Sequence, residues 1–336
     1  MKTFFLILFT ICQLPLAAEP VKLIFDTDMG NDIDDAQALA MIHALQDRGA
    51  VELLAVTSTK DHPLSAAYID ALNTFYGRPD IPIGAVKNGV TPEQGKYLGI
   101  AERKDTAGKL VYPHDLKSGA DAMEAVALIR KTLAAQPDSS VVIAQVGFFT
   151  NLVRLIDSKP DEFSPLTGEE LIRKKVKQLG VMAGAFTTIN GNKHYCEYNV
   201  VKDIPSAQAL AKNWPGMINW SGFEIGISVT YPNESIVNDY NYVADHLIKE
   251  SYLAYCQIGE HRPTWDLTTV LQLVYPDRGY FGLSGEGTVT VEKDGFTVFK
   301  AEGKQHRFLT MDEKQSVRVK EAFAQLCSTP PSRLLK

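Results

Sequence analysis

The chain of 336 residues is predicted to fold as a single α/β domain, an open and mostly parallel β-sheet flanked by helices. Short apolar runs of strand length alternate with stretches of helical periodicity along most of the sequence, a pattern typical of parallel sheets with helices on both faces. No internal repeat, low-complexity linker or clear boundary divides the chain. Length alone permits one or two domains, and the lack of a boundary favours one domain over residues 19–330.

The elements follow each other in a regular order. Strands are expected at residues 21–25, 51–57, 82–85, 141–146 and 176–182. Helices are expected at residues 36–45, 65–76, 121–135 and from 150 to 156 onward. The run 141–146 is almost wholly apolar, as in a strand buried on both faces. Near the end of the chain, residues 287–299 have the pattern of a small β-hairpin around Gly295, and Pro330-Pro331 begins a loose tail.

The first 18 residues are predicted to be a signal peptide rather than part of the fold. Lys2 gives a positive start, residues 4–11 are apolar, and Leu16-Ala17-Ala18 offers a cleavage site. The apolar stretch is too short for a transmembrane helix, so no membrane insertion is expected. Because Ile11 before Cys12 fits a lipoprotein site poorly, export to the periplasm or the medium is favoured over lipid anchoring.

Composition narrows the class of partner. The net charge is −6 and no basic block is present, so nucleic acid is not an expected partner. A small-molecule substrate is expected instead, and a homo-oligomer is possible. After cleavage three cysteines remain, Cys196, Cys256 and Cys327. Three cysteines cannot all pair within one chain, which excludes a disulfide framework.

The most informative segment is an aspartate-rich loop that follows the first predicted strand. It holds five aspartates within ten residues, Asp26, Asp28, Asp32, Asp34 and Asp35. Ligands bind at the carboxyl ends of strands in open α/β sheets, and clustered carboxylates suit hard cations such as Ca²⁺ or Mg²⁺. In the alternative interpretation, Asp34 and Asp35 only favour a helix N-terminus and Asp26 caps a turn, which leaves part of the cluster unexplained.

Three further segments carry polar groups at comparable places. Residues 147–151, Gly-Phe-Phe-Thr-Asn, directly follow a predicted strand, where backbone carbonyls can serve a cation or Thr150 can simply cap a helix. Glu197 and Asn199 share a face if their segment is extended, and together they can hold vicinal hydroxyls, although loop polarity explains them equally well. Asp266 opens an apolar helix, as a ligand or as an N-cap.

Together these segments resemble the inosine–uridine nucleoside hydrolase family, over roughly residues 21–310. Residues 26–36 are similar to the family signature, in a form with two extra residues before the Asp-Asp pair. Residues 147–151 look like the Gly-x-x-Thr-Asn turn of the family, and residues 197–199 look like its Glu-Phe-Asn segment.

The resemblance implies Ca²⁺-dependent hydrolysis of the N-glycosidic bond of ribonucleosides, or of related N-ribosyl compounds, to ribose and free base. The metal ligands would be Asp28, Asp35 and Asp266 through their carboxylates and Thr150 through its backbone oxygen. Asp28 would also accept a proton from the attacking water. The residues that would hold the ribose are Asp34, Asn192, Glu197 and Asn199. Asp26 would brace the loop from behind the ligands.

The chain also departs from the family pattern. With two inserted residues, Asp32 could replace Asp34 at the ribose or join the metal shell. Many members carry His where this chain has Trp265, and that His is tied to protonation of the leaving base. Trp265 could stack on the base or pack in the core, and an acid could come from His194 or His261. The segment 59–61, Thr-Lys-Asp, lacks an Asn often found near the ribose, so Lys60 or Asp61 could alter that corner.

Three other classes were weighed. Phosphatases of the haloacid dehalogenase type want Thr or Val two residues after the second Asp, where this chain has Gly30. An EF-hand loop needs helices on both sides, whereas a strand precedes this cluster. An exported ribose- or nucleoside-binding protein with little or no turnover remains as the alternative, and release of free base distinguishes it from a hydrolase.

Overall fold

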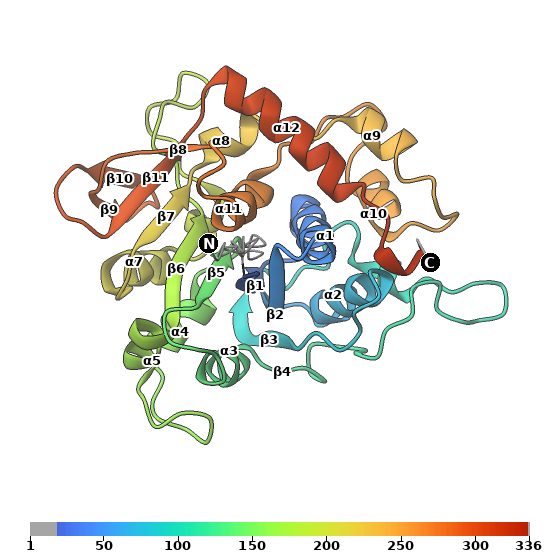
Figure 1. Ribbon diagram of the computed structural model, residues 1–336, viewed down its shortest axis with the longest axis horizontal. Helices are drawn as coiled ribbons and strands as arrows, with labels where there is room; N and C mark the ends of the chain where they lie inside the picture. Colours follow the sequence, from blue (N-terminus) through green and yellow to red (C-terminus); the bar gives the residue numbers. More distant parts are fainter. Residues whose placement is uncertain (1–18, 335–336) are drawn as a thin grey trace, which may run out of the picture.

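The computed structural model describes residues 19–334, so the predicted signal peptide lies outside the described residues. Its centre is a nine-stranded sheet in the order β4-β3-β2-β1-β5-β6-β7-β11-β8, parallel except where β8 pairs with β11. The strands are β1 Val21–Thr27, β2 Val51–Lys60, β3 Ile83–Val90, β4 Met123–Glu124, β5 Val141–Gln145, β6 Val176–Met182, β7 Ile218–Ser221, β8 Gly282–Leu283 and β11 His306–Thr310. The predicted fold class is thereby confirmed (Figure 1).

Helices cover both faces of this sheet (Figure 1). They are α1 Asp34–Asp47, α2 Pro63–Phe75, α3 Ala125–Ala134, α4 Thr150–Asp157, α5 Gly168–Lys175, α6 Tyr198–Lys202, α7 Ile204–Asn213, α8 Phe223–Ile227, α9 Asn233–Asn238, α10 Leu247–Tyr255, α11 Trp265–Val274 and α12 Glu313–Cys327, with 3₁₀ turns at Leu98–Glu102 and Ser332–Leu334. The late hairpin is also present, as β9 Thr288–Val291 and β10 Thr297–Lys300. Within residues 19–334, no helix is long and apolar enough to cross a membrane.

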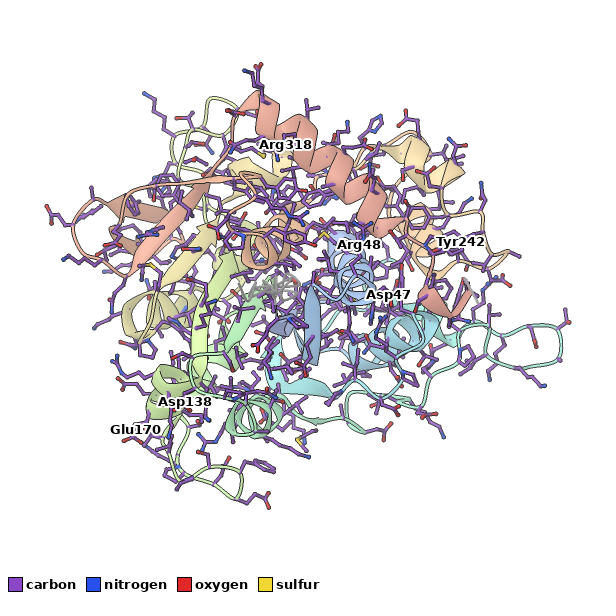
Figure 2. The ribbon with its side chains drawn as sticks, viewed as in Figure 1. Asp47, Arg48, Asp138, Glu170, Tyr242 and Arg318 are labelled. Atoms are coloured by element: carbon purple, nitrogen blue, oxygen red, sulfur yellow. The ribbon has the colours of Figure 1, made fainter. Side chains whose placement is uncertain are left out.

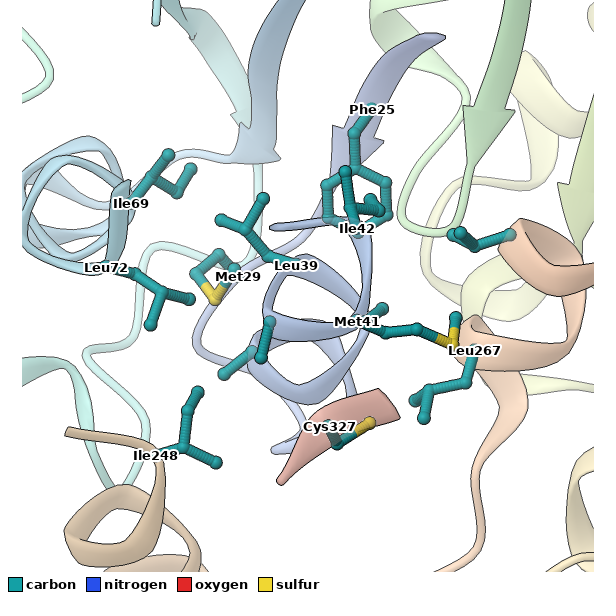
Figure 3. Close-up of a cluster of buried hydrophobic side chains, with 14 of the residues drawn as sticks. Phe25, Met29, Leu39, Met41, Ile42, Ile69, Leu72, Ile248, Leu267 and Cys327 are labelled. Carbon is teal, nitrogen blue, oxygen red and sulfur yellow. The ribbon is translucent and has the colours of Figure 1, made fainter. Parts of the chain in front are cut away.

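The side chains of β1 alternate between two hydrophobic cores, one on each face of the sheet. Leu23 and Phe25 belong to the core formed with α1, α2, α11 and α12, and Ile24 belongs to the core formed with α3, α4, α5 and α7. The first core is drawn in Figure 3, where Phe25, Met41 and Leu267 gather around α1. Because both faces of β1 are buried, the polar side chains at its carboxyl end are held on a rigid support.

Two details differ from the sequence-based expectation. The helix predicted from residue 121 begins only at Ala125, because Glu124 caps it by accepting a hydrogen bond from the Ala127 N–H at 2.9 Å. The preceding residues join the sheet as β4. Helix α1 is longer than the predicted residues 36–45. It ends at Asp47, and Arg48 is its C-cap; both residues are labelled in Figure 2.

The three remaining cysteines do not form disulfides. Cys196, Cys256 and Cys327 are all free thiols in the described part of the chain, which agrees with the sequence-based expectation.

The order of the strands has one consequence for function. From β1 the chain builds the sheet outward through β2, β3 and β4, and it then returns to place β5 on the other side of β1. The carboxyl ends of β1 and β5 therefore flank the point where the direction of winding changes. In open α/β sheets this switch point is where a crevice forms and ligands bind.

Candidate active site

A cavity of about 290 Å³ lies at this switch point. Its carboxyl groups are those of Asp28, Asp32, Asp34, Asp35, Glu197 and Asp266. Its aromatic side chains are those of Tyr198, Phe223, Tyr255 and Trp265. Asn31, Val146, Met182, Asn199 and Arg262 complete the lining. The volume suits a small molecule rather than a polymer.

Four of the aspartates form what we call the carboxylate cluster: Asp28, Asp34, Asp35 and Asp266. Carboxylate oxygens of Asp34, Asp35 and Asp266 lie within 4.8 Å of one another, and the Asp28 carboxyl lies beside that of Asp35. α1 contributes Asp34 and Asp35 in its first turn, and α11 contributes Asp266 in its own first turn. Two helix N-termini thus point at one group of carboxylates, which places positive dipole ends next to negative charge.

Burial dominates the electrostatics of this cluster. The pKa values of Asp34, Asp35 and Asp266 are raised well above the ordinary aspartate value, first by burial and then mainly by the charges of the neighbouring aspartates. Burial also raises the pKa of Asp28. Buried like charges at this spacing are unfavourable unless a cation neutralises them. With oxygen donors only, the set fits a hard cation such as Ca²⁺.

Asp32, one of the two aspartates with an ambiguous role, forms an ion pair. Both carboxylate oxygens of Asp32 accept hydrogen bonds from Arg262, from Nε at 3.0 Å and from Nη2. Asp32 therefore faces Arg262, while Asp34 lies in the carboxylate cluster and its Oδ2 accepts a hydrogen bond from the Asp266 N–H at 3.1 Å. The structure thus separates the two aspartates whose roles the sequence left ambiguous.

Tyr97 holds the aspartate loop in shape. Its hydroxyl accepts a hydrogen bond from the Gly30 N–H at 2.8 Å and donates to the Asp32 carbonyl at 2.7 Å. Gly30 has φ +118°, and a Cβ there would come within 2.6 Å of the Leu98 side chain. A left-handed backbone without space for a side chain requires glycine. The aspartate loop is thus held by Tyr97 and Leu98, at the start of the 3₁₀ turn Leu98–Glu102.

Asp26 lies beneath the loop and outside the cavity lining. Its Oδ1 accepts hydrogen bonds from the Thr57 hydroxyl at 2.5 Å and from the Asn151 amide at 2.8 Å. Burial raises the pKa of Asp26 to about 7. The side chain ties β1 to β2 and α4.

Lys60 reaches the cluster through Asn31. Its ammonium group is almost fully buried and donates to the Asn31 side-chain oxygen at 2.6 Å and to the Thr91 carbonyl at 2.9 Å. The Asn31 amide in turn donates to Asp28 at 2.6 Å. Lys60 therefore orients a hydrogen-bond donor onto Asp28, whereas Asp61 points away and accepts from the Gly89 N–H.

Gly147 lets the β5–α4 turn approach the aspartate loop. A Cβ at Gly147 would come within 2.5 Å of the Asp28 backbone nitrogen, so close approach, not an unusual backbone angle, requires the glycine. Thr150 is the first residue of α4, and its hydroxyl donates to Asp203 at 2.8 Å. Thr150 is not the N-cap, because Phe149 occupies that position. Thr150 does not belong to the cavity lining.

Glu197 and Asn199 both line the cavity, but their segment is not extended. Glu197 caps α6, and its carboxylate accepts from the backbone N–H groups of Asn199 at 2.9 Å, Val200 at 3.2 Å and Gly184 at 3.2 Å. The Asn199 amide nitrogen donates to the Val146 carbonyl at 3.0 Å. Burial nevertheless raises the pKa of Glu197 to about 7. A helix cap and the first turn of α6 bring the two polar groups together, so they do not depend on an extended segment.

Three further residues considered from sequence also lie outside the lining. Asn192 is exposed, and its side-chain oxygen accepts from the His194 N–H at 2.9 Å. His194 pairs with Asp294 and stacks on Phe296, and His261 is exposed and accepts from the Asn233 N–H. The chain turns tightly between Ile189 and Asn192, whose backbones hydrogen-bond to each other. No histidine of residues 19–334 lines the cavity.

Trp265 is half-buried, and its ring forms part of the cavity wall. The indole N–H donates to the Phe223 carbonyl at 2.9 Å, and the two rings lie 5.1 Å apart. A Cβ at Gly226 would come within 2.0 Å of the indole ring. Gly226 therefore makes room for a tryptophan at this position. One part of the ring packs against Phe223, and the side chain also lines the cavity.

Several lining residues were not identified from sequence: Asn31, Tyr198, Phe223, Tyr255 and Arg262. Tyr198 lies between Glu197 and Asn199, and Arg262 lies three residues before Trp265. Their closeness in sequence to predicted site residues could have identified both as candidate lining residues. Phe223 and Tyr255 come from α8 and the end of α10, and no local pattern marks them.

The fold and the site define an α/β protein with a carboxylate-lined cavity at the switch point of its sheet. The chain belongs to the inosine-uridine preferring nucleoside hydrolase family, whose model matches residues 23–325. The family takes its name from the hydrolysis of nucleosides.

Solved structures show the same fold. A plant nucleoside hydrolase is 19% identical, with a TM-score of 0.70 over 93% of this chain and 100% of that one. A purine-preferring ribonucleoside hydrolase from Gardnerella vaginalis is 17% identical, with a TM-score of 0.69 over 91% and 98%. An inosine-uridine preferring nucleoside hydrolase from Bacillus anthracis is 17% identical, with a TM-score of 0.67 over 91% and 99%.

An uncharacterized protein of Schizosaccharomyces pombe is similar in sequence as well. It is 27% identical over 207 residues, which are 56% of this chain and 57% of that protein. The chain thus spans somewhat more than half the length of this relative.

Proposed function

We propose that the protein hydrolyses the N-glycosidic bond of ribonucleosides, or of closely related N-ribosyl compounds, with the help of Ca²⁺. The observation that carries this proposal is the carboxylate cluster, in which three buried aspartates bring oxygens within 4.8 Å at the family's switch-point cavity. Glu197 and Asn199 beside it supply the polar groups that ribose hydroxyls need.

Asp28, Asp35 and Asp266 are the proposed carboxylate ligands of the metal, and Thr150 is proposed to add its backbone oxygen. Bound Ca²⁺ supplies the electrostatic pull that lowers the pKa of the attacking water. The test of this set is a calorimetric Ca²⁺ titration. Asp266→Asn should abolish binding, and the exposed surface variant Asp138→Asn should bind as the wild type does (Figure 2). Equal binding by wild type and Asp266→Asn would refute the ligand set.

Two residues have separate roles in the proposed reaction, Asp28 as general base and Asn31 as the group that orients it. Asp28 takes a proton from the water as its oxygen attacks the anomeric carbon, which is general base catalysis worth roughly 10²–10⁴-fold. The bond between ribose and base breaks, and its electron pair leaves with the base. The Asn31 amide, at 2.6 Å from Asp28, keeps that carboxylate oriented during the proton transfer.

The ribose is proposed to lie against Asp34, Glu197 and Asn199. Because three backbone N–H groups fix Glu197, its carboxylate accepts from a ribose hydroxyl in one geometry. The amide nitrogen of Asn199 is held by the Val146 carbonyl, which leaves its side-chain oxygen as the acceptor for a neighbouring hydroxyl. Trp265 is proposed to stack on the base.

The decisive experiment uses the mature protein with CaCl₂ and a panel of ribonucleosides, with chromatography to detect free base. We expect free base and ribose in equal amounts, and loss of turnover when EDTA removes the metal. If nucleosides bind and no free base appears, the protein is the binding protein considered above instead of a hydrolase.

We further propose that the mature protein starts at Glu19 and acts outside the cytoplasm. β1 starts at Val21, so cleavage before Glu19 would remove none of the described elements. The measurement is the intact mass of the exported protein, and a mass that includes residues 1–18 would contradict this.

A further inference from the structure

Arg262 is the single cationic side chain among the residues that line the cavity. Its guanidinium lies over the rings of two other lining residues, 5.1 Å from the centre of Tyr255 and 5.4 Å from the centre of Trp265. It thus belongs to the aromatic part of the lining, where the base is proposed to stack.

The position of Arg262 is fixed from three sides. Asp32 engages its Nε and Nη2 edge. The Arg262 backbone N–H donates to the Tyr252 hydroxyl at 3.0 Å, and its carbonyl accepts from the Tyr231 N–H at 2.7 Å. Because the fork with Asp32 uses one edge of the planar group, the Nη1 edge is the one that a ligand can meet.

The charge of Arg262 is permanent. Burial works to lower its pKa, but the hydrogen bonds and the charge of Asp32 outweigh this effect and the pKa is raised. An arginine that stays protonated cannot act as a general acid, yet it can donate hydrogen bonds from a fixed positive charge. Fixed donors aimed at developing negative charge are an effective form of catalysis in a partly desolvated site.

We propose that Arg262, held by Asp32, is the catalytic residue that stabilises the leaving base as an anion. This inference rests on the proposed function and assigns a residue to the leaving-group side of the same reaction. When the glycosidic bond breaks, its electron pair goes to the base nitrogen and the Arg262 guanidinium donates to the negatively charged base. The base gains its proton from solvent afterwards, so the net products are ribose and neutral base.

The competing explanation is that Arg262 only holds the aspartate loop through Asp32. The two explanations predict different effects of removing Arg262 on the hydrolysis rates of ribosides with different leaving groups. A structural role lowers the rates of all ribosides by the same factor. A charge-stabilising role lowers the rates most for leaving groups that depart as poorly stabilised anions, and it changes the dependence of rate on leaving-group pKa.

The experiment compares Arg262→Gln with the wild type, both loaded with Ca²⁺, on inosine, uridine and phenyl ribosides that differ in ring substituents. We expect kcat for inosine to fall by roughly 10²–10³-fold, as when one donor to a developing anion is lost. The loss for 4-nitrophenyl riboside should be under about tenfold, because nitrophenolate stabilises its own charge. The slope of log kcat against leaving-group pKa should become steeper.

Three variants serve as controls. Arg262→Lys keeps the charge and should recover part of the loss on inosine. The double variant Asp32→Asn with Arg262→Gln leaves no unpaired charge, so it should fold and show the same steeper slope. Arg278→Gln removes an exposed arginine that also lies over an aromatic ring, 3.8 Å from the centre of Tyr275, but outside the cavity. Its kinetics should match the wild type.

The outcomes separate this inference from the proposed function. If the wild type cleaves ribosides and Arg262→Gln lowers all rates equally with an unchanged slope, the assignment of Arg262 is wrong and the hydrolase proposal stands. If the wild type releases no base or phenol from any riboside, both fail.

Discussion

Two groups of side chains line one cavity, and they were built in different ways. The carboxylate cluster comes mainly from one short loop and a helix start, held by backbone and by buried braces such as Asp26. The aromatic residues Phe223, Tyr255 and Trp265, with Arg262, come from α8, α10, α11 and the segment before α11. The first group lies mostly in the loop that resembles the family signature, whereas each residue of the second group comes from a different part of the chain. We infer that the first sets the type of reaction and the second sets which leaving group is tolerated.

The largest effect should come from the ribose itself. A site built to bond hydroxyls rejects an analogue without one by roughly 10⁴–10⁵ in the best cases. We therefore expect kcat/KM for uridine to exceed that for 2′-deoxyuridine by a large factor, and Glu197→Ala to narrow the gap. Equal turnover of the two nucleosides would break the assignment of this part of the cavity to ribose.

The next effect tests the carboxylate cluster. Asp28→Asn keeps the shape of the side chain and removes the base, so kcat should fall by roughly 10²–10⁴-fold. Asp138→Asn makes the same chemical change in an exposed ion pair with Lys175 and should leave kcat unchanged. Near-normal kcat for Asp28→Asn at saturating Ca²⁺ would show that another group takes the proton.

The aromatic group is tested by the leaving group. Without a lining histidine, 4-nitrophenyl riboside should be preferred over inosine in kcat/KM by roughly 10²-fold or more, the typical worth of a general acid. Trp265→His should narrow this preference if the imidazole reaches the base. His194→Ala and His261→Ala should change nothing, because both histidines are exposed outside the lining. Equal rates for inosine and the nitrophenyl riboside would contradict this account.

The smallest effect is on stability. Burial raises the pKa of Glu197 from 4.5 to about 7 in the folded chain. Folding thus favours the protonated form of Glu197. The contribution of this proton to the free energy of unfolding, of the order of 3 kcal/mol, is fully present below pH 4.5 and is lost as the pH rises through 7. In EDTA, the free energy of unfolding should fall from pH 5 to pH 8, and Glu197→Gln should flatten that dependence. Denaturant titrations at several pH values measure it, and identical slopes for the two proteins would contradict the assignment.

Sequence predicted the fold well because hydrophobic periodicity reports on burial. The strands around residues 21–25, 141–146 and 176–182 are apolar runs in the central part of the sheet, and the structure confirms them. Elements at the edge were harder: β4 has two residues and is positioned by pairing with β3, which no local pattern announces. Tertiary pairing, not propensity, decides such short strands.

The sequence predicted the site residues that lie close together along the chain. It did not predict contacts between residues that are far apart in sequence and meet only in the folded protein. The aspartates of the loop could be read directly from the sequence. The ion pair of Asp32 with Arg262 spans 230 positions, and no local pattern indicates that Asn192 lies outside the cavity lining. Glu197 and Asn199 both line the cavity through a helix cap, whereas the sequence argument was conditional on an extended segment.

The most direct test of the whole account is a crystal structure with Ca²⁺ and a C-ribonucleoside, whose carbon–carbon link resists hydrolysis. We expect one Ca²⁺ with oxygens of Asp28, Asp35 and Asp266 at about 2.3–2.6 Å, the ribose against Glu197 and Asn199, and the base against Trp265 and within hydrogen-bond reach of Arg262. A Ca²⁺ ion bound without Asp266, or a base lying away from Arg262, would contradict the division of the cavity described here.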